Sequence, residues 1–167
     1  MRKKSCILFG LIAMILVSSS VGEEKASFAE GHRPGDMAPK IKPEGSREAV
    51  DFANQTGRYT LVNFWATYDA VSRIRNMQLG RKAGELDSTR LLLCSVSLDE
   101  KAVIFAETLK TDGLDTSGQW FAGKERSTLI RKYRLKNRFT NFLVDDRGVI
   151  VATGLSVQQL SKFKIQD

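Results

Sequence analysis

Cysteine, histidine and proline are all scarce in this chain of 167 residues. It holds two cysteines, Cys6 and Cys94, one histidine, His32, and three prolines, the last of them Pro43. With so few cysteines and histidines, the chain cannot provide the ligand spacings of the usual zinc sites, and we expect no metal. A Ser–His–Asp hydrolase is disfavoured because the lone histidine lies in a proline-bearing segment. No glycine-rich phosphate loop or nucleotide fingerprint occurs, so no cofactor is predicted.

The N-terminus has the pattern of an export signal. A basic stretch at residues 2–4 precedes an apolar run at 6–17 and a run of mostly small polar residues at 18–22. The apolar run is shorter than the ~20 residues that a transmembrane helix needs. We therefore interpret residues 1–22 as a cleaved signal peptide and expect a periplasmic or cell-envelope protein without a transmembrane segment in its mature chain. An uncleaved short anchor is the alternative.

Removal of residues 1–22 leaves 145 of the 167 residues, enough for one domain with a hydrophobic core. Three basic residues leave with them, so the formal net charge falls from +7 to +4, and nucleic-acid binding is not indicated. Cys94 becomes the only cysteine, which excludes an internal disulfide. It lies in the apolar run 91–98, where a buried thiol normally has low reactivity.

The rest of the chain alternates predicted strands and helices. Residues 23–45 are polar and hold all three prolines, so we expect an extended lead-in before a domain at 46–167. Strands are predicted at 59–67, 91–98, 139–144 and 149–153, helices at 46–54, 70–86, 101–109, 127–133 and 156–163, and a loop at 111–124. In the helix at 70–86, the apolar face is expected from Val71, Ile74, Met77 and Leu79.

The order strand–helix–strand, helix, hairpin, helix predicts an α/β fold with a mixed central sheet flanked by helices. A crossover through a helix makes the first two strands parallel, whereas the tight turn Asp145-Asp146-Arg147-Gly148 makes the last two antiparallel.

Four segments match a known family in the right order. Residues 61–73 read Leu-Val-Asn-Phe-Trp-Ala-Thr-Tyr-Asp-Ala-Val-Ser-Arg; the others are Gly-Asp-Met-Ala-Pro at 35–39, Val-Ser-Leu-Asp at 96–99, and 133–148 with its Thr-Asn-Phe-Leu-Val-Asp stretch. From about residue 35 to the C-terminus, the chain resembles the exported thiol-disulfide reductases of the TlpA/ResA kind. The resemblance implies a thioredoxin-like fold.

The chain departs from that family where the chemistry lies. The family carries Trp-Cys-x-x-Cys at this turn, with a cis-proline loop packed against it. Here Asp69 and Ser72 stand at the cysteine positions and Phe139 at the proline position. Because a thiolate is the nucleophile of disulfide exchange, the resemblance implies a degenerate, redox-inactive site. The Arg138–Phe139 peptide bond is expected to be trans.

Asp69 directly precedes a predicted helix, where its carboxylate can accept hydrogen bonds from free backbone N–H groups. Such a cap contributes on the order of 1 kcal/mol, and the positive end of the helix dipole favours a negative charge there. We favour a cap over an acid–base role. Ser72 would need a general base to act as a nucleophile, and none is indicated nearby.

Trp65, Tyr68 and Phe139 are candidates for a partner-binding surface. In the family, the tryptophan side of the site is a shallow apolar surface that meets partner proteins. Three aromatic rings here would form an exposed patch suited to an envelope protein or peptide. The alternative is that Phe139 turns into the core and Tyr68 only covers the start of the helix.

Basic residues crowd the segment 124–138, in which Glu125 is the only acid. The segment could recruit an acidic partner or a polyanionic envelope surface, although a solvated helix face is the simpler explanation. The basic residues are Lys124, Arg126, Arg131, Lys132, Arg134, Lys136 and Arg138.

Two functions from different classes remain open. The first is a non-catalytic, exported binding module that holds a protein or peptide on the former substrate face. The second is an oxidoreductase of the TlpA/ResA kind with residual or unconventional activity, for example through Cys94. The missing dithiol favours the first.

Overall fold

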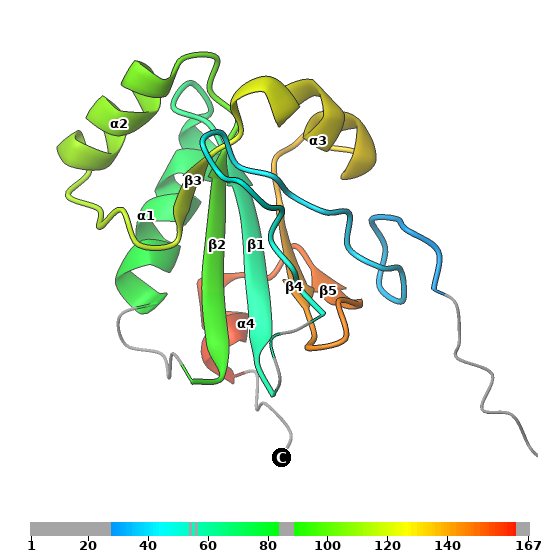
Figure 1. Cartoon of the computed structure of the whole chain (residues 1–167). Helices are drawn as coiled ribbons and strands as arrows, with labels where there is room; N and C mark the ends of the chain where they lie inside the picture. The colour runs from blue at the N-terminus through cyan, green and yellow to red at the C-terminus, as the bar shows by residue number, and fades with distance from the viewer. Residues whose placement is uncertain (1–27, 54, 56, 84–88, 163–167) are drawn as a thin grey trace, which may run out of the picture.

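The computed structural model describes residues 28–53, 55, 57–83 and 89–162. The predicted signal peptide, residues 1–22, lies outside these ranges, as does the end of the helix predicted at 70–86. Figure 1 shows the described chain as one twisted sheet with helices packed on both faces. Within the described ranges, no helix has the length and apolar character needed to cross a membrane.

The sheet has five strands in the order β3-β2-β1-β4-β5. Parallel pairs join β1 to β2 and β2 to β3, and antiparallel pairs join β1 to β4 and β4 to β5, which confirms the predicted mixed sheet. The strands are β1 (Tyr59–Trp65), β2 (Leu91–Ser97), β3 (Gln119–Phe121), β4 (Asn141–Val144) and β5 (Ile150–Thr153). The prediction of a loop throughout 111–124 missed β3, because three residues are too few to show strand alternation.

Four α-helices connect or follow the strands, close to the predicted positions. They are α1 (Ala70–Ala83), α2 (Ala102–Thr111), α3 (Arg126–Lys132), which follows the 3₁₀ turn η1 (Gly123–Glu125), and α4 (Val157–Lys162). Ser156 caps α4: the Gln159 N–H donates to its Oγ at 3.2 Å, and the Gln159 side chain accepts from the Ser156 N–H at 2.8 Å.

The helix predicted at 46–54 is wrong for residues 46–53, and residue 54 lies outside the described part. The segment forms turns and bends, and Val50 makes an isolated antiparallel bridge with Ile41, whose carbonyl accepts from the Val50 N–H at 2.7 Å. This bridge helps to place Ile41 and Phe52 in the core. Tertiary burial therefore overrides the weak helical pattern.

The sheet separates two groups of buried residues. On the α3 face, Phe64 packs against Tyr133 and Phe142, with ring centroids 4.7 and 6.0 Å apart. The described part of the lead-in joins this face through Ala38 and Ile41, and its Pro39 carbonyl accepts from the Tyr133 hydroxyl at 2.6 Å. On the face covered by α1 and α4, a smaller cluster holds Leu61, Leu79, Leu143 and Leu160.

The apolar face expected for α1 is largely wrong. Val71 and Ile74 are 73% and 55% exposed, and only Leu79 of the expected set is fully buried. The buried side instead contains Ser72 and Asn76, one turn apart. The reason lies beneath the helix, where the sheet presents polar side chains toward the end of β1.

Candidate functional site

The turn between β1 and α1, residues 66–69, lies at the end of the sheet flanked by α2 and α3 (Figure 1). Asp69 caps α1 as predicted: the Ser72 N–H donates to its Oδ1 at 2.7 Å. The carboxylate thus occupies the first turn of the helix, where free N–H groups and the helix dipole stabilise negative charge. This geometry holds Asp69 in place as a cap.

Ser72 is a structural link between the turn and the helix. It is 1% exposed. Its hydroxyl accepts from the Ala66 N–H at 3.2 Å and donates to the Asp69 carbonyl at 3.1 Å. Both bonds go to the backbone and use the one proton that the hydroxyl carries. Neither Asp69 nor Ser72 therefore has the arrangement of an activated nucleophile.

A buried polar network lies behind the turn, under α1, and sequence reasoning missed it. Asn63 of β1 donates to Ser95 of β2 at 2.9 Å and to Asn76 of α1 at 3.3 Å. Asn76 in turn bonds Ser95 and exchanges hydrogen bonds with Gln119 of β3, at 3.3 and 3.4 Å. Asn63, in the middle of an otherwise apolar run, was the one signal available in the sequence.

Arg75 connects this network to the loop that carries Phe139. Its Nε donates to the Asn63 side chain at 3.1 Å, and its Nη2 donates to the carbonyls of Phe64 and Phe139 at 3.2 and 3.0 Å. Burial lowers the pKa of Arg75, an effect that the nearby charge of Asp69 opposes. The described peptide bonds are all trans, including Arg138–Phe139, as expected. A guanidinium group thus holds the loop in place.

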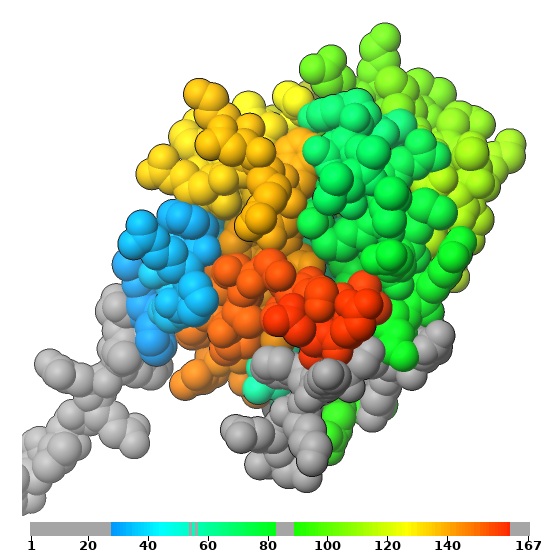
Figure 2. All heavy atoms as spheres, turned by 180° about the vertical axis from the view of Figure 1, so that it is seen from behind, coloured from blue at the N-terminus to red at the C-terminus, as the bar shows by residue number. Residues whose placement is uncertain are grey.

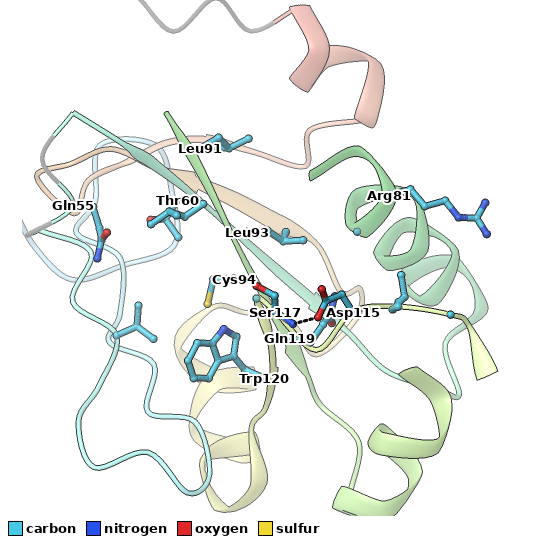
Figure 3. Close-up of a pocket in the computed structure, with 16 residues that line it drawn as sticks. Gln55, Thr60, Arg81, Leu91, Leu93, Cys94, Asp115, Ser117, Gln119 and Trp120 are labelled. Atoms are coloured by element: carbon cyan, nitrogen blue, oxygen red, sulfur yellow. Dashed lines mark hydrogen bonds between the residues drawn. The ribbon is translucent and has the colours of Figure 1, made fainter. Parts of the chain in front are cut away.

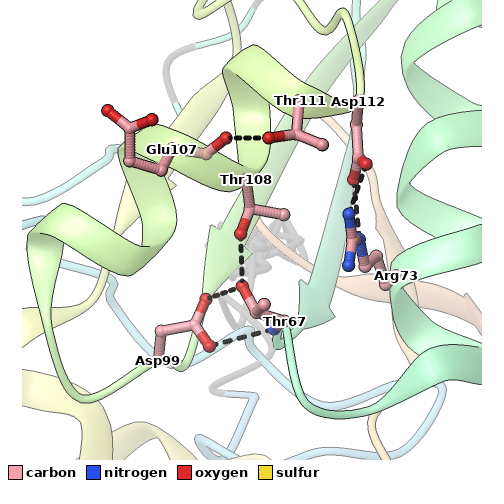
Figure 4. Close-up of polar contacts among 7 residues, drawn as sticks. All are labelled: Thr67, Arg73, Asp99, Glu107, Thr108, Thr111 and Asp112. Atoms are coloured by element: carbon pink, nitrogen blue, oxygen red, sulfur yellow. Dashed lines mark hydrogen bonds and ion pairs between the residues drawn. The ribbon is translucent and has the colours of Figure 1, made fainter.

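A second polar network ties the turn to α2 (Figure 4). Asp99 is 2% exposed, and its carboxylate accepts from the Thr67 N–H and hydroxyl, both at 2.9 Å, and from the Ser97 hydroxyl at 2.8 Å. Thr67 and Thr108 hydroxyls lie 2.9 Å apart. Because the Thr67 proton is used by Asp99, Thr108 is the donor to Thr67. Three donors satisfy the buried carboxylate, which makes it a structural support for the turn.

Trp65 lies in the interior, which corrects the expected patch of three exposed aromatic rings. It is fully buried, with its ring 6.1 Å from that of Phe105, and its indole N–H has no acceptor among the described residues. Tyr68 is 63% exposed and meets the half-buried Phe139 edge to face, with centroids 6.1 Å apart. Phe139 packs against the core from this position. Two aromatic rings therefore remain at the surface.

Exposed aliphatic side chains extend this pair, and we call Tyr68, Val71, Ile74 and Phe139 the turn surface. Beside it lies a hollow of about 310 Å³, lined in part by Tyr68, Ile74 and Met77. Arg73 and Asp112 also line it, and Arg73 donates two hydrogen bonds of 2.8 and 2.5 Å to the Asp112 carboxylate. A second hollow of about 400 Å³ shares Arg73 and is lined by Val103 and Ile104 of α2, both exposed.

Cys94 lies in the middle of β2, beside a pocket of about 690 Å³ that Leu91, Leu93, Gln119 and Trp120 also line (Figure 3). The thiol is buried, and burial raises its pKa to about 12. Few Cys94 thiols are therefore ionised at neutral pH, which makes Cys94 a poor nucleophile for disulfide exchange. In the part of the chain that the structure describes, no three His, Cys, Asp or Glu side chains gather to hold a metal ion.

Solved structures similar to this chain include thioredoxin-like proteins and thiol-disulfide oxidoreductases. A thioredoxin-like protein from Parabacteroides distasonis is 44% identical, with a TM-score of 0.74 over 81% of this chain and 97% of that chain. The thioredoxin domain of a thiol-disulfide oxidoreductase from Bacteroides vulgatus is 22% identical, with a TM-score of 0.67 over 78% of this chain and 97% of its own.

A thiol:disulfide interchange protein from Bacteroides sp. is also 22% identical, with a TM-score of 0.64 over 81% of this chain and 90% of its own. These two more distant structures share the fold. No family model matches the chain, and neither does any curated protein. The 44% identity over four fifths of the sequence is decisive, and this chain belongs to the thioredoxin-like proteins.

Proposed function

We propose that this chain is an exported thioredoxin-like domain that does not cycle disulfides and instead binds a protein or peptide partner on the turn surface. The observation that carries the proposal is the hydrogen bond from the Ser72 N–H to the Asp69 carboxylate. In the resembled reductases, the attacking thiolate occupies the Asp69 position. Here the Asp69 carboxylate supplies the negative charge at the start of α1. A carboxylate cannot form a disulfide, so disulfide exchange at this position is not possible.

The binding half of the proposal is supported by what remains exposed around the turn. Tyr68, Val71 and Ile74 present apolar side chains to solvent, with a hollow beside them. Asp99 holds the backbone of Thr67, just before these residues, and Arg75 holds the loop that carries Phe139. A rigid surface with exposed aromatic and aliphatic side chains is suited to partner recognition, because little conformational entropy is lost on binding.

The alternative, an oxidoreductase that acts through Cys94, is less well supported. The Cys94 thiol lies on β2, away from the turn, and its raised pKa leaves it protonated at neutral pH. A lone buried cysteine also lacks a second thiol to resolve a mixed disulfide. Rapid alkylation of Cys94 in the folded protein would favour this alternative.

Export is part of the proposal. It depends on the pattern of residues 1–22, with the periplasm or cell envelope as the destination and an envelope protein or peptide as the partner. The lead-in at 23–45 would then begin the mature chain, ahead of the domain at 46–167.

Site-directed photo-crosslinking tests the proposal. A benzophenone maleimide is attached to Ala70→Cys, at the exposed first residue of α1 beside the turn, or to Arg58→Cys, exposed just before β1. Each variant also carries Cys94→Ala, and each is irradiated with an envelope extract of the source organism. We expect a discrete crosslinked product from position 70 that is absent from position 58 and disappears when Tyr68→Ala is added. Identical products from both positions, or none from position 70, would contradict partner binding at the turn.

A further inference from the structure

We infer that the partner segment bound at the turn surface is an acidic peptide in which carboxylates flank a large apolar side chain. This inference depends on the proposed function and names the chemistry of its partner. The reason is that three guanidinium groups lie beside the aromatic pair of exposed Tyr68 and half-buried Phe139.

Two of the guanidinium groups are held by hydrogen bonds, and the third follows from its place in the chain. Arg126 donates through Nε to the Leu98 carbonyl at 2.7 Å, and its Nη2 lies 3.4 Å from the Tyr68 hydroxyl. Arg75 donates to the Phe139 carbonyl at 3.0 Å. Arg138 is exposed and directly precedes Phe139, close enough for its charge to lower the pKa of Arg75. Positive charge therefore lies on two sides of the aromatic pair.

The carboxylates nearest the turn are already committed to other groups. Asp69 caps α1, Asp99 accepts from Thr67 and Ser97, and Asp112 pairs with Arg73. Within the described residues, no carboxylate lies within ion-pair distance of Arg75, Arg126 or Arg138, and this includes the neighbouring Glu100 and Glu125. Asp69 acts on Arg75 only through the field of its charge, so among the described residues none of these three guanidinium groups is neutralised by an ion pair.

The basic segment 124–138 extends this charge beyond the turn. Figure 2 shows α3 and the residues after it, in yellow and gold, beside the start of α1 in green. Lys132 is paired with Glu30 at 2.9 Å, but Arg131, Arg134 and Lys136 are exposed and have no ion-pair partner among the described residues. An acidic chain would be attracted along this side before its apolar residue reaches Tyr68.

The surface fits a peptide better than an anionic membrane. The guanidinium groups border a pair of aromatic rings, and the hollow of about 310 Å³ beside Tyr68 and Ile74 offers a place for one large side chain. A membrane-binding surface would need only a broad basic face, without a hollow for a side chain.

Selection from a phage library of random linear peptides tests the inference. The baits are the full mature chain, Arg138→Glu, Tyr68→Ala, and Arg58→Glu, which makes the same charge change before the start of β1 as a matched control. We expect the mature chain to select peptides that combine Asp or Glu with Leu, Ile, Phe or Trp. Binding of the best peptide should fall at least about tenfold in Arg138→Glu and with rising salt, and should not change in Arg58→Glu.

The outcomes separate this inference from the proposed function. Neutral or basic peptides that bind the wild type and Arg138→Glu equally but not Tyr68→Ala would overturn the acidic partner and leave the turn surface as a binding site. No enrichment, or peptides that still bind Tyr68→Ala, would contradict both. A third outcome is that no peptide is selected, while the chain binds phosphatidylglycerol vesicles equally well with and without Tyr68→Ala. This outcome would overturn the inference in favour of a membrane-binding surface. Thermal melts confirm that each variant is folded.

Discussion

The two faces of the central sheet are built from different chemistry. The α3 face is mainly apolar, with Phe64, Tyr133 and Phe142 in mutual contact. The α1 face is apolar only where Leu61, Leu79, Leu143 and Leu160 meet. Toward the turn it becomes polar, through Asn63, Asn76, Ser95 and Gln119, all buried and hydrogen-bonded.

This difference separates what holds the fold from what positions the turn. Burial of aromatic rings is non-directional, so we expect the α3 face, with the larger buried cluster, to contribute most of the stability. Hydrogen bonds fix geometry, and the polar end of the α1 face fixes Arg75, which in turn holds the Phe139 loop. The loss of both cysteines therefore leaves the surrounding scaffold intact.

The largest loss of stability is expected for a substitution in the aromatic cluster of the α3 face. Phe142→Ala should lower the free energy of unfolding by about 3–5 kcal/mol, because it leaves a cavity between Phe64 and Tyr133. Phe28→Ala is the control, since Phe28 is exposed, and it should change stability by less than ~0.5 kcal/mol. Urea unfolding of the two variants makes the comparison. Equal effects would show that the aromatic cluster is not the main source of stability.

A substitution in the polar part of the α1 face should lower the free energy of unfolding by less than Phe142→Ala does. Asn76→Ala should destabilise by about 1–3 kcal/mol, because Ser95 and Gln119 lose a buried hydrogen-bonding partner. Gln78→Ala, exposed on the same helix, is the matched control and should be nearly neutral. A cost above that of Phe142→Ala in the same urea series would reverse the proposed division of roles.

Burial of the Cys94 thiol on the apolar α3 face should make the free energy of unfolding depend on pH. Burial raises its pKa to about 12, so the folded thiol stays neutral while the unfolded thiol ionises from ~8.5 upward. The resulting stability is complete below the unfolded pKa and is lost as pH rises toward the folded one. Between about pH 8 and pH 10, wild type should lose about 1–2 kcal/mol more than Cys94→Ala. Parallel loss in both proteins would indicate an accessible, ionised thiol.

The smallest effect concerns the cap. Asp69→Ala should destabilise by roughly 0.5–2 kcal/mol at neutral pH, whereas Asp69→Asn and Asp69→Ser should cost less because both can still accept from the Ser72 N–H. Thermal melts of the three variants provide the measurement. An alanine variant that melts at or above wild type would mean that Asp69 is strained in the folded protein, and a functional carboxylate would become the better explanation.

The sequence predicts the fold well because its strands are apolar runs and its turns carry their usual residues. Four of the five strands and the cap at Asp69 follow from these local patterns. The buried face of α1 does not follow from local patterns, because it depends on Asn63 and Ser95, which lie in other elements. Helical periodicity alone predicts that Val71 and Ile74 are buried. The burial of Trp65 also escapes prediction, since α2 supplies the covering ring through Phe105.

Insulin reduction with the purified mature chain is the most direct test of the central claim, that the domain keeps the thioredoxin-like fold without its redox chemistry. The assay follows insulin precipitation in the presence of dithiothreitol, with thioredoxin as the positive control. We predict a rate equal to that of dithiothreitol alone, for both the wild type and Cys94→Ala. Turnover above this background in wild type, abolished in Cys94→Ala, would contradict the account and show that Cys94 carries a disulfide-exchange activity.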